Sequence, residues 1–569
     1  MPSLGPKRSA PRQADYGTHR GRIVRALLFA VMPLIWPSVA RAADFHCAGG
    51  DVHCLFDAIN VSNSNGEPNT IRLDAGTYTL TAPDNVLPPP FAFGNGFPII
   101  TGRMAITGAA ADHTIIERAN YRTDLVTNAF RFFNVAASGE LGLERLTLRG
   151  GNTGMNSLAG NAGAILSHGS LTISDSAVTD NFAALAGAVQ IANGTFTLRD
   201  SRVERNNVDL GGDIVSIGNR LGATGPFGPV SATIERTTFA DNRMLDGGVI
   251  SSSTTASTRI TDTTVAGTRI GNGEGGAIVA FGPVFISNAT LIDNTGGHGH
   301  VVFIGGADTL VVNSTIVNNL GSVTGLFRVQ NSIIAGNRGE LPGECTGGLV
   351  SLGHNLIGDP RGCTSVLPSD LTGDAGLGSF VTGGRPGGGH VPLLADSRAI
   401  DAADPAECPA TDQRQLARPV DGNGDGVRGC DIGAVEFYPV VNDLLQVVAV
   451  RAAFQRPPTV SDLINPWAAG GSFQIDSTFI NLAPTNICHV AFDVASLGAN
   501  SATVTMLAPD AQPLGEQGVT IPATSLGAPA DLAVQGQEFY HFAIGVSRPE
   551  AITFLVNVLG EPFAGACTP

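Results

Sequence analysis

One eleven-residue template recurs through the middle of the chain. Apolar residues stand at positions 1, 3 and 8, usually Ser or Thr at position 6, and Asn at position 11, as in LTISDSAVTDN from Leu171. A seventh copy starts at Thr258 and has Thr268 in place of the Asn. Alternating apolar residues mark short strands with one buried face, and strands repeated once per coil build a solenoid. The six Asn positions are Asn181, Asn206, Asn242, Asn294, Asn319 and Asn337.

Each recurring Asn has a role in such a solenoid. Its amide can donate to one neighbouring coil and accept from the other, which satisfies buried polar groups in a structural ladder. A second motif lies between the copies, a small residue and Gly followed by an apolar pair, as in GGVI at 247–250 and GGAI at 275–278. Because Gly tolerates positive φ, these pairs predict tight corners.

The fold class follows from what the repeat excludes. No helical stretch separates the copies, so the strands are not βαβ units, and a β-sandwich has no reason to repeat one template. The elements FADN at 239–242 and GGAI at 275–278 resemble repeats of polymorphic outer-membrane-protein passengers and of pectate-lyase-like proteins. The resemblance implies an all-β chain whose residues 43–349 form a right-handed parallel β-helix with an N-terminal cap.

The expected N-terminal cap begins with a cysteine-rich segment. Leu55, Ala58 and Ile59 have helical spacing, which predicts a short amphipathic helix over the first coil. TIRLDAGTYTLT at 70–81 then alternates as strand, turn and strand. The segment from Cys54 resembles the CSLREA-type start of secreted β-helix proteins, where it has a structural role.

Four blocks follow the repeats: HNLIGD at 354–359, SRAIDAAD at 397–404, DQRQLARP at 412–419 and CDIGAVEF at 430–437. This series resembles the choice-of-anchor Q domain. The resemblance implies that residues 350–438 cap the β-helix of a secreted bacterial protein, with CDIGAVEF as the closing strand, and it implies no reaction.

Beyond the blocks, residues 445–569 carry alternating segments without the Asn template. Several short strands separated by turn signals predict an immunoglobulin-like β-sandwich. The whole chain is therefore expected to be a β-helix followed by a sandwich.

The first 42 residues predict a signal peptide. Arg20, Arg22 and Arg25 precede the apolar run 26–39, and ARA at 40–42 fits a cleavage site. The run is short for a membrane span, although an uncleaved anchor is the alternative. We therefore expect a secreted or cell-surface protein with no transmembrane segment in the mature chain.

The eight cysteines fall into neighbouring pairs, and an even count in an exported chain predicts disulfides. Eight cysteines allow 105 connectivities, so the pairing from proximity alone is one choice among many. Zinc is the alternative, but no C-x-x-C spacing occurs. The expected pairs are Cys47 with Cys54, Cys345 with Cys363, Cys408 with Cys430, and Cys488 with Cys567.

The charge balance limits the class of partner. The net charge is −16, and residues 1–42 hold seven of the 33 basic but one of the 49 acidic residues, so the mature chain is more acidic still. This acidic balance argues against a nucleic-acid partner, because phosphate neutralisation needs clustered Lys and Arg, so we expect none.

A glycan-active enzyme is the main rival to a binding protein. Glycoside hydrolysis needs paired carboxylates. GHG at 297–299 matches a short polygalacturonase motif, but the adjacent aspartate pair of that family is missing, since the chain contains no DD sequence. Asp213, Asp246 and Glu274 stand near expected corners, and His298 and His300 in a Gly-rich corner. The simpler interpretation is that the three acidic side chains are solvated and that the two histidines lie in a structural corner. No catalytic residue is therefore assigned.

The segment DGNGDG predicts a calcium loop in part. Asp421, Asn423 and Asp425 have the 1, 3, 5 spacing of an EF-hand loop, and the carbonyl of Val427 takes position 7. Position 12 is Ile432 rather than a carboxylate, so Asp431 would have to fold back. The alternative is a tight Gly/Asp/Asn turn without metal. Calcium is the one cofactor predicted.

These features favour an exported, non-enzymatic surface or extracellular protein that adheres to or contacts carbohydrate through its β-helix, with a polysaccharide or cell-surface ligand. The alternative is a lyase or hydrolase of an acidic polysaccharide. The lining of a groove on one coil face discriminates between them. Several carboxylates with an Arg or His between them favour the enzyme, whereas Ser, Thr and Asn favour binding.

Overall fold

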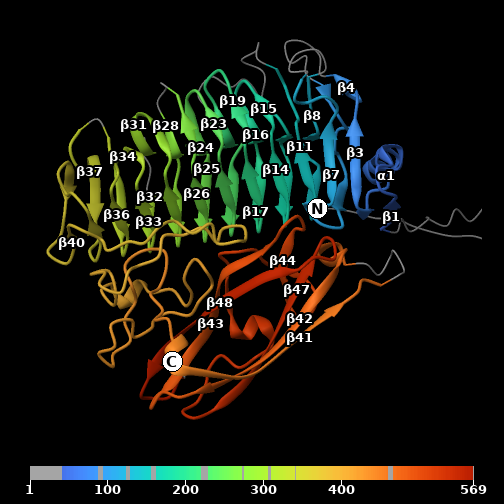
Figure 1. Cartoon of the computed structure of the whole chain (residues 1–569). Helices are drawn as coiled ribbons and strands as arrows, with labels where there is room; N and C mark the ends of the chain where they lie inside the picture. Colours follow the sequence, from blue (N-terminus) through green and yellow to red (C-terminus); the bar gives the residue numbers. More distant parts are fainter. Residues whose placement is uncertain are drawn as a thin grey trace, which may run out of the picture. The chain divides into compact units, whose positions relative to one another are not determined.

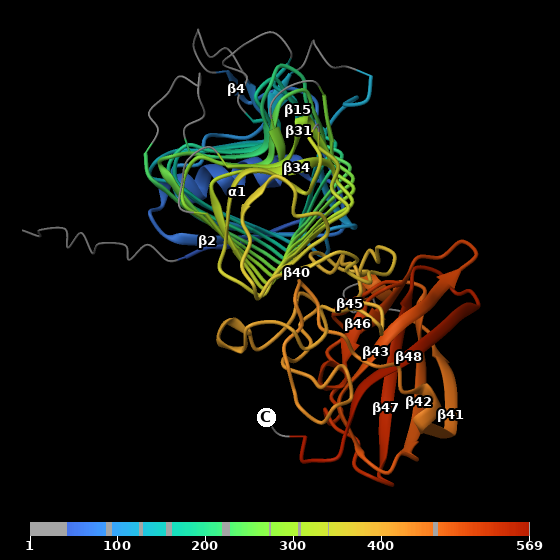
Figure 2. The same cartoon turned by 90° about the vertical axis from the view of Figure 1, so that its left-hand side faces the viewer.

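Parallel strands stacked coil upon coil form the N-terminal two thirds of the chain, and the predicted parallel β-helix is confirmed (Figure 1). The computed structural model describes residues 42–86, 94–123, 129–154, 162–218, 228–271, 275–304, 309–339, 341–458 and 465–567. The predicted signal peptide, apart from Ala42, lies outside the described residues. Viewed along the stack, successive coils superimpose and their sheets form its walls (Figure 2).

Sheet A is one wall of the helix, and its strands pair in parallel from coil to coil. Its strands are β1 (Asp44–Cys47), β2 (Pro68–Leu73), β6 (Arg103–Thr107), β10 (Glu140–Glu144), β13 (Ser170–Ser174), β17 (Gly194–Arg199), β21 (Val230–Glu235), β25 (Ala256–Thr261), β29 (Val284–Ser287), β32 (Thr309–Val312), β35 (Phe327–Gln330), β37 (Cys345–Ser351) and β39 (Cys363–Ser365).

Sheet B follows sheet A in each coil after a sharp corner. Its strands are β3 (Gly76–Leu80), β7 (Thr114–Arg118), β11 (Thr147–Arg149), β14 (Ala177–Thr179), β18 (Arg202–Glu204), β22 (Thr238–Ala240), β26 (Thr264–Ala266), β30 (Thr290–Ile292), β33 (Thr315–Val317), β36 (Ile333–Ala335), β38 (Leu356–Ile357) and β40 (Leu371–Thr372).

Sheet C closes each coil, in most coils as two successive strands. Its strands are β4 (Asn85–Val86), β5 (Gly94–Asn95), β8 (Phe130–Arg131), β9 (Phe133–Val135), β12 (Ile165–Ser167), β15 (Phe182–Ala183), β16 (Ala186–Ile191), β19 (Asn207–Val208), β20 (Asp213–Ile217), β23 (Arg243–Met244), β24 (Gly247–Ser252), β27 (Arg269–Ile270), β28 (Gly275–Ala280), β31 (Thr295–Ile304) and β34 (Leu320–Gly325).

The recurring Asn side chains form a hydrogen-bonded ladder inside the helix. The Oδ1 atom of Asn206 accepts from the backbone N–H of Asn181 at 3.0 Å and from its Nδ2 at 2.9 Å. Asn242 accepts in the same way from Asn206, and Asn319 from Asn294. Each amide thereby pairs the backbone of one coil with the side chain of the next, which leaves few buried polar groups unsatisfied.

The corners that flank each sheet B strand have left-handed backbone. In the coil of β13 and β14, Asp175 has φ +49° and Asp180 has φ +55°. The same two template positions, the fifth and the tenth, are occupied in other coils mainly by Asp, Asn, Gly or Arg, all with positive φ. Asp and Asn adopt this region more readily than most residues.

The glycine pairs of sheet C allow close approach between coils. Gly275 has φ +155°, and a Cβ atom there would lie 1.9 Å from the carbonyl oxygen of Gly247 in the coil below. Any side chain at this position would force the two coils apart, which is the physical reason for the predicted Gly corner.

The N-terminal end is covered by α1 (Val52–Ser64), as predicted, with Leu55, Ala58 and Ile59 buried against the first coils.

Four disulfides join the cysteines in their neighbouring pairs: Cys47–Cys54, Cys345–Cys363, Cys408–Cys430 and Cys488–Cys567. No helix among the described residues is long and apolar enough to cross a membrane.

Residues 374–438, here called the flank segment, lie on the outer face of sheet B. The Nε2 atom of Gln413 donates to the Thr264 hydroxyl at 3.0 Å, and the Thr290 hydroxyl donates to its Oε1 at 2.6 Å. A second apolar core forms there between sheet B residues such as Ile292 and Val317 and flank residues such as Ile432. This segment therefore covers the flank of several coils.

CDIGAVEF at 430–437 is not the predicted closing strand. It is irregular, and its N–H groups bond outside any sheet: Gly433 donates to the carbonyl oxygen of Asn331, and Ala434 to the hydroxyl of Thr315. Since its partners are corner and side-chain atoms of the β-helix, no continuous strand ladder forms. This segment is tied to the flank of the solenoid.

The C-terminal part is an antiparallel β-sandwich, as predicted. One sheet contains β41 (Leu445–Gln455), β42 (Gly471–Asn481), β47 (Gln537–Val546), β44 (Val504–Leu507) and β45 (Pro513–Gly515). The other contains β46 (Thr520–Pro522), β43 (Asn486–Ala499) and β48 (Ile552–Phe563). Short 3-10 helices lie at Pro405–Glu407, Asn442–Leu444, Pro466–Ala468 and Ala523–Leu526.

Candidate functional site

An outward row of side chains crosses sheet A at the second position of the template. Because side chains alternate along a strand, this position points away from the core. The parallel register aligns Thr233, Arg259, Phe285, Leu310 and Arg328 on five consecutive strands. The row begins with Thr and then changes to large side chains, two of which are cationic.

A shallow hollow of about 460 Å³ lies on this row, here called the Arg259 groove. Among the described residues, none that lines it carries a carboxylate. Hydroxyl, aromatic, aliphatic and guanidinium groups share its surface. The lining residues are Ser231, Ala232, Thr233, Ser257, Thr258, Arg259, Pro283, Val284, Phe285, Leu310 and Arg328.

Arg259 and Phe285 form the most specific contact in the groove. The guanidinium carbon of Arg259 lies 4.3 Å from the centre of the Phe285 ring, while the Arg259 side chain is exposed and Phe285 half-buried. A cation over an aromatic face is held there by the quadrupole of the ring. Within the described part of the chain, Arg259 makes no ion pair, so its exposed guanidinium group lies against the ring rather than against a carboxylate.

The described residues give little support to the alternative that the protein is a glycan-active enzyme. Asp213 is buried, and its Oδ1 atom accepts the backbone N–H of Gly248 at 3.0 Å, which is a corner role. His300 lies on β31 and bonds the Thr324 hydroxyl through Nδ1 at 2.7 Å. Asp246 immediately precedes β24, whereas Glu274 and the side chain of His298 lie outside the described residues. Asp213, Asp246 and His300 do not line the groove.

The DGNGDG segment is a turn built on its own carboxylates. The Oδ1 atom of Asp421 accepts from the N–H groups of Gly424 and Asp425, and its Oδ2 from that of Gly426 at 2.7 Å. Asn423 accepts from Asp425 at 2.9 Å, and Asp425 from Val427 at 2.8 Å. The side chains of positions 1, 3 and 5 thus order the loop that the calcium prediction requires.

Asp431 does not fold back onto this loop. Its buried carboxylate accepts the backbone N–H groups of Asp401 at 2.8 Å and of Phe437. Burial raises the pKa of Asp431 to about 7, and these hydrogen bonds offset only part of that effect. The missing acid at Ile432 is therefore not replaced by Asp431.

The carboxylate that reaches the loop instead is Asp401, which the sequence interpretation missed. It accepts the backbone N–H of Asn423 at 2.9 Å and that of Gly422 at 3.4 Å. Burial raises its pKa, and the nearby Asp421 adds to the shift. Asp401 lies in the block SRAIDAAD, which the block DQRQLARP separates from the loop, so no local pattern in the sequence indicated this contact. Calcium binding stays a prediction.

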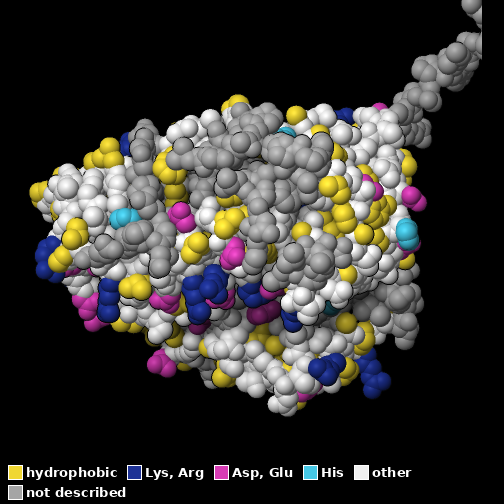
Figure 3. Space-filling view, turned by 90° about the horizontal axis from the view of Figure 1, so that it is seen from above, with side chains coloured by type: hydrophobic (Ala, Val, Ile, Leu, Met, Phe, Trp, Pro, Cys, Tyr) yellow, Lys and Arg dark blue, Asp and Glu magenta, His cyan; other side chains and the backbone are white. Residues whose placement is uncertain are grey.

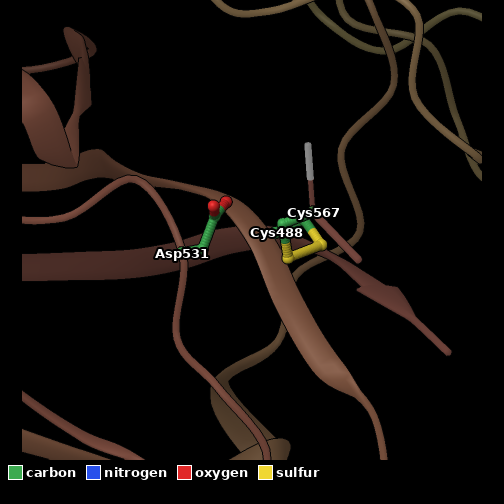
Figure 4. Close-up of side chains that lie close together, drawn as sticks. All are labelled: Cys488, Asp531 and Cys567. Carbon is green, nitrogen blue, oxygen red and sulfur yellow. A yellow bond between two sulfur atoms is a disulfide. The ribbon is translucent and has the colours of Figure 1, made fainter. Parts of the chain in front are cut away.

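Cys488, Asp531 and Cys567 are the one group of three metal-ligating side chain types that converge among the described residues (Figure 4). The two sulfur atoms are joined in a disulfide, so no thiolate is available to a metal. Asp531 accepts the backbone N–H of His489 at 3.0 Å, which is a structural role.

Comparisons with known proteins identify no family. No protein-family model matches the chain, and no curated protein is detectably similar in sequence. The resemblance to the choice-of-anchor Q domain and to the repeat families therefore stays a prediction.

Solved structures with a similar fold include the A-module of a mannuronan C-5 epimerase from Azotobacter vinelandii, at 13% identity and a TM-score of 0.28, covering 57% of this chain and 96% of the module. A family PL6 alginate lyase matches at 10% identity and a TM-score of 0.24, over 66% of this chain and 60% of the lyase. The enzymatically active domain of tailspike protein 4 of bacteriophage CBA120 matches at 10% identity and a TM-score of 0.20, over 91% of this chain and 65% of the tailspike chain. Scores this low say nothing of the ligand of this chain.

Proposed function

We propose that this protein is an exported, non-enzymatic protein that contacts a polysaccharide through the Arg259 groove. The observation that carries the proposal is the stacked pair of Arg259 and Phe285 in a groove lined by hydroxyl groups and free of carboxylates among the described residues. Aromatic faces bind the apolar faces of sugar rings, and hydroxyl and guanidinium groups supply hydrogen bonds to their polar edges.

The same lining counts against the hydrolase alternative. Glycoside hydrolysis uses one carboxyl group as acid and another as base or nucleophile, on opposite sides of the scissile bond. Ser231, Thr233 and Ser257 offer hydroxyls that can bind a sugar but cannot take these roles unaided. The groove therefore supports binding without cleavage.

Export is part of the proposal and is supported by the cysteines. Four disulfides and no free cysteine are found in the described residues. Such bonds persist in oxidising compartments and are rare in the cytosol. On the face that Figure 3 shows, blue and magenta charged side chains are scattered among mostly white and yellow atoms, in a chain in which 14% of residues are charged.

The test is a panel of neutral and acidic polysaccharides in affinity electrophoresis. We expect the protein to be retarded by some of them, and Phe285→Ala to lose most of this retardation. Phe539→Ala is the matched control, because Phe539 is an exposed aromatic residue of β47 in the sandwich. Polymer length is followed by gel filtration in parallel. Shortening of any polymer contradicts the proposal, as does binding that F285A leaves unchanged.

A further inference from the structure

The arginines of this acidic chain are commonly held against carboxylates. Arg149 lies 2.6 Å from Glu117, Arg236 lies 2.6 Å from Asp200, and Arg428 lies 2.8 Å from Glu561. Arg259 differs, because its guanidinium rests on a phenyl ring and its side chain is exposed. An aromatic support leaves the charge of the guanidinium uncompensated, so the groove is a local positive feature on a negative protein.

We infer that the Arg259 groove selects anionic glycans, and that the chain of the glycan runs along the axis of the β-helix. The inference rests on the proposed function and names its ligand class, a linear polysaccharide with repeated carboxylate or sulfate groups. A guanidinium presents a planar fork of N–H donors that matches such oxyanions in bidentate geometry. The contact with Phe285 restricts the Arg259 side chain before the ligand arrives, which reduces the entropy lost on binding.

The direction of the ligand follows from the register. Arg259, Phe285, Leu310 and Arg328 occupy one row on β25, β29, β32 and β35, so the row runs across the strands and along the stack. Adjacent strands are about 4.8 Å apart, so three steps separate the two arginines by about 14 Å. A single sugar cannot reach both arginines, so we expect oligomers to bind more tightly than monosaccharides.

The neighbouring hydroxyls fit the same orientation. Ser231 and Ser257 are exposed and lie beside the arginine row, in register on β21 and β25. They can bond the sugar hydroxyls of a chain lying along the groove, while the arginines bond its acidic groups. Phe285 and Leu310 give apolar contact between the two charged positions.

The decisive comparison uses one polymer with and without its charge. Isothermal titration calorimetry with polygalacturonate and with its methyl ester keeps the backbone of the polymer and removes the carboxylates. We expect the acid form to bind at least about tenfold more tightly, with an affinity that falls as NaCl screens the charges. Chondroitin sulfate forms a second arm, which separates carboxylate from sulfate preference.

Single variants test the two arginines. Arg259→Gln is expected to weaken binding of polygalacturonate by about tenfold or more, because one charge-assisted contact is lost. Arg259→Lys keeps the charge but loses the planar fork, and is expected to bind several-fold more weakly than the parent. Arg328→Gln should weaken binding of the polymer but leave binding of galacturonic acid unchanged. Arg269→Gln is the matched control, an exposed arginine on β27 of sheet C, with an effect below about twofold.

The outcomes separate this inference from the proposed function. Equal binding of the acid and the ester, with F285A still defective, overturns the charge selectivity but keeps the glycan groove. An R259Q protein that binds polygalacturonate like R269Q also overturns the selectivity. No binding to the acid, the ester or the sulfated polymer overturns the charge selectivity, and it overturns both proposals when no polysaccharide of the neutral and acidic panel retards the protein either.

Discussion

The Oε2 atom of Glu344 accepts a 2.7 Å hydrogen bond from the backbone N–H of Asn337, and its Oε1 accepts from Gly336 at 2.8 Å. The asparagine ladder therefore ends on a carboxylate. In a second ladder, the backbone N–H of Ser314 donates to the Ser332 hydroxyl, and the backbone N–H of Ser332 donates to Oδ1 of Asn355. It also ends on a carboxylate, because Oδ1 of Asp370 accepts from both the backbone N–H and Nδ2 of Asn355. A carboxylate accepts without donating, so no further coil is needed to satisfy it.

Breaking the ladder in its middle should destabilise the β-helix. Asn206→Ala removes the acceptor for two donors of Asn181 and the donor to the carbonyl of Val178. We expect a loss of about 2–4 kcal/mol in the free energy of unfolding, measured by urea denaturation, because buried groups are left unpaired. Thr197→Ala, an outward position on β17, is the control, with an effect within about 0.5 kcal/mol. Equal effects for the two variants contradict a structural ladder.

Restoring the ladder where the template lapses should stabilise the protein. The hydroxyl of Thr268 is buried without a hydrogen-bond partner among the described residues, while its backbone N–H donates to Asn294 at 3.1 Å. In Thr268→Asn the new amide can accept from Asn242 and donate to Asn294, so we expect a gain of about 1–2 kcal/mol. Thr268→Val is the control and should be nearly neutral. A T268N protein less stable than T268V contradicts the prediction.

Acid should weaken the junction of the flank segment and the sandwich. Although burial raises the pKa of Glu561, the nearby His489 imidazole and hydrogen bonds from Arg428 and from the N–H of Asp421 lower it overall to about 2. A depressed carboxylate pKa gives stability that is present above about pH 4.5 and lost as the pH falls towards 2.

The matching variant is Glu561→Gln. Its free energy of unfolding should be lower than that of the parent by about 2–3 kcal/mol at pH 7, and the gap should close towards pH 2. Urea denaturation of both proteins between pH 7 and pH 2.5 measures this difference, and the comparison cancels the contributions of other titrating groups. A gap that stays constant with pH contradicts the assigned pKa shift.

Calcium should raise the melting temperature if the DGNGDG loop binds it. At a free calcium concentration of about one hundred times the dissociation constant, the expected stabilisation is about 2.7 kcal/mol. EDTA should reverse it, and Asp425→Asn should weaken it, whereas Asp443→Asn, an exposed acid outside the loop, should not. A melting temperature that neither calcium nor EDTA alters excludes the loop as a calcium site.

Local patterns in the sequence were enough to predict the β-helix. Apolar alternation placed the strands, and the Asn at position 11 pointed to the ladder, because both depend on contacts that recur between neighbouring coils. The left-handed corners were missed, although the Asp and Asn at positions 5 and 10, such as Asp175 and Asp180, were the signal for them. The path of the flank segment could not be predicted, because it depends on long-range contacts such as that of Gln413 with Thr264.

The Arg259 groove was missed for a different reason. Arg259 and Phe285 are far apart in the sequence, and loops of unequal length separate the copies, so only the register of the sheet brings them together. Aligning the seven copies and reading down position 2 gives Thr172, Thr197, Thr233, Arg259, Phe285, Leu310 and Arg328. That column was the available signal, and the alternation rule already placed it on the outside.

The stacked register also fixes the distances between side chains in the outward row of sheet A. Each coil adds one step of about 4.8 Å to the row on sheet A. The equivalent residues Asn294 and Asn319 of two neighbouring coils are 25 residues apart, so one complete coil there is a block of that length. Deleting the coil that carries Leu310 would bring Arg259 and Arg328 one step closer. The spacing between charged groups on a bound polymer can therefore be tuned in whole steps, by duplication or loss of a coil, without any change to the arginines themselves.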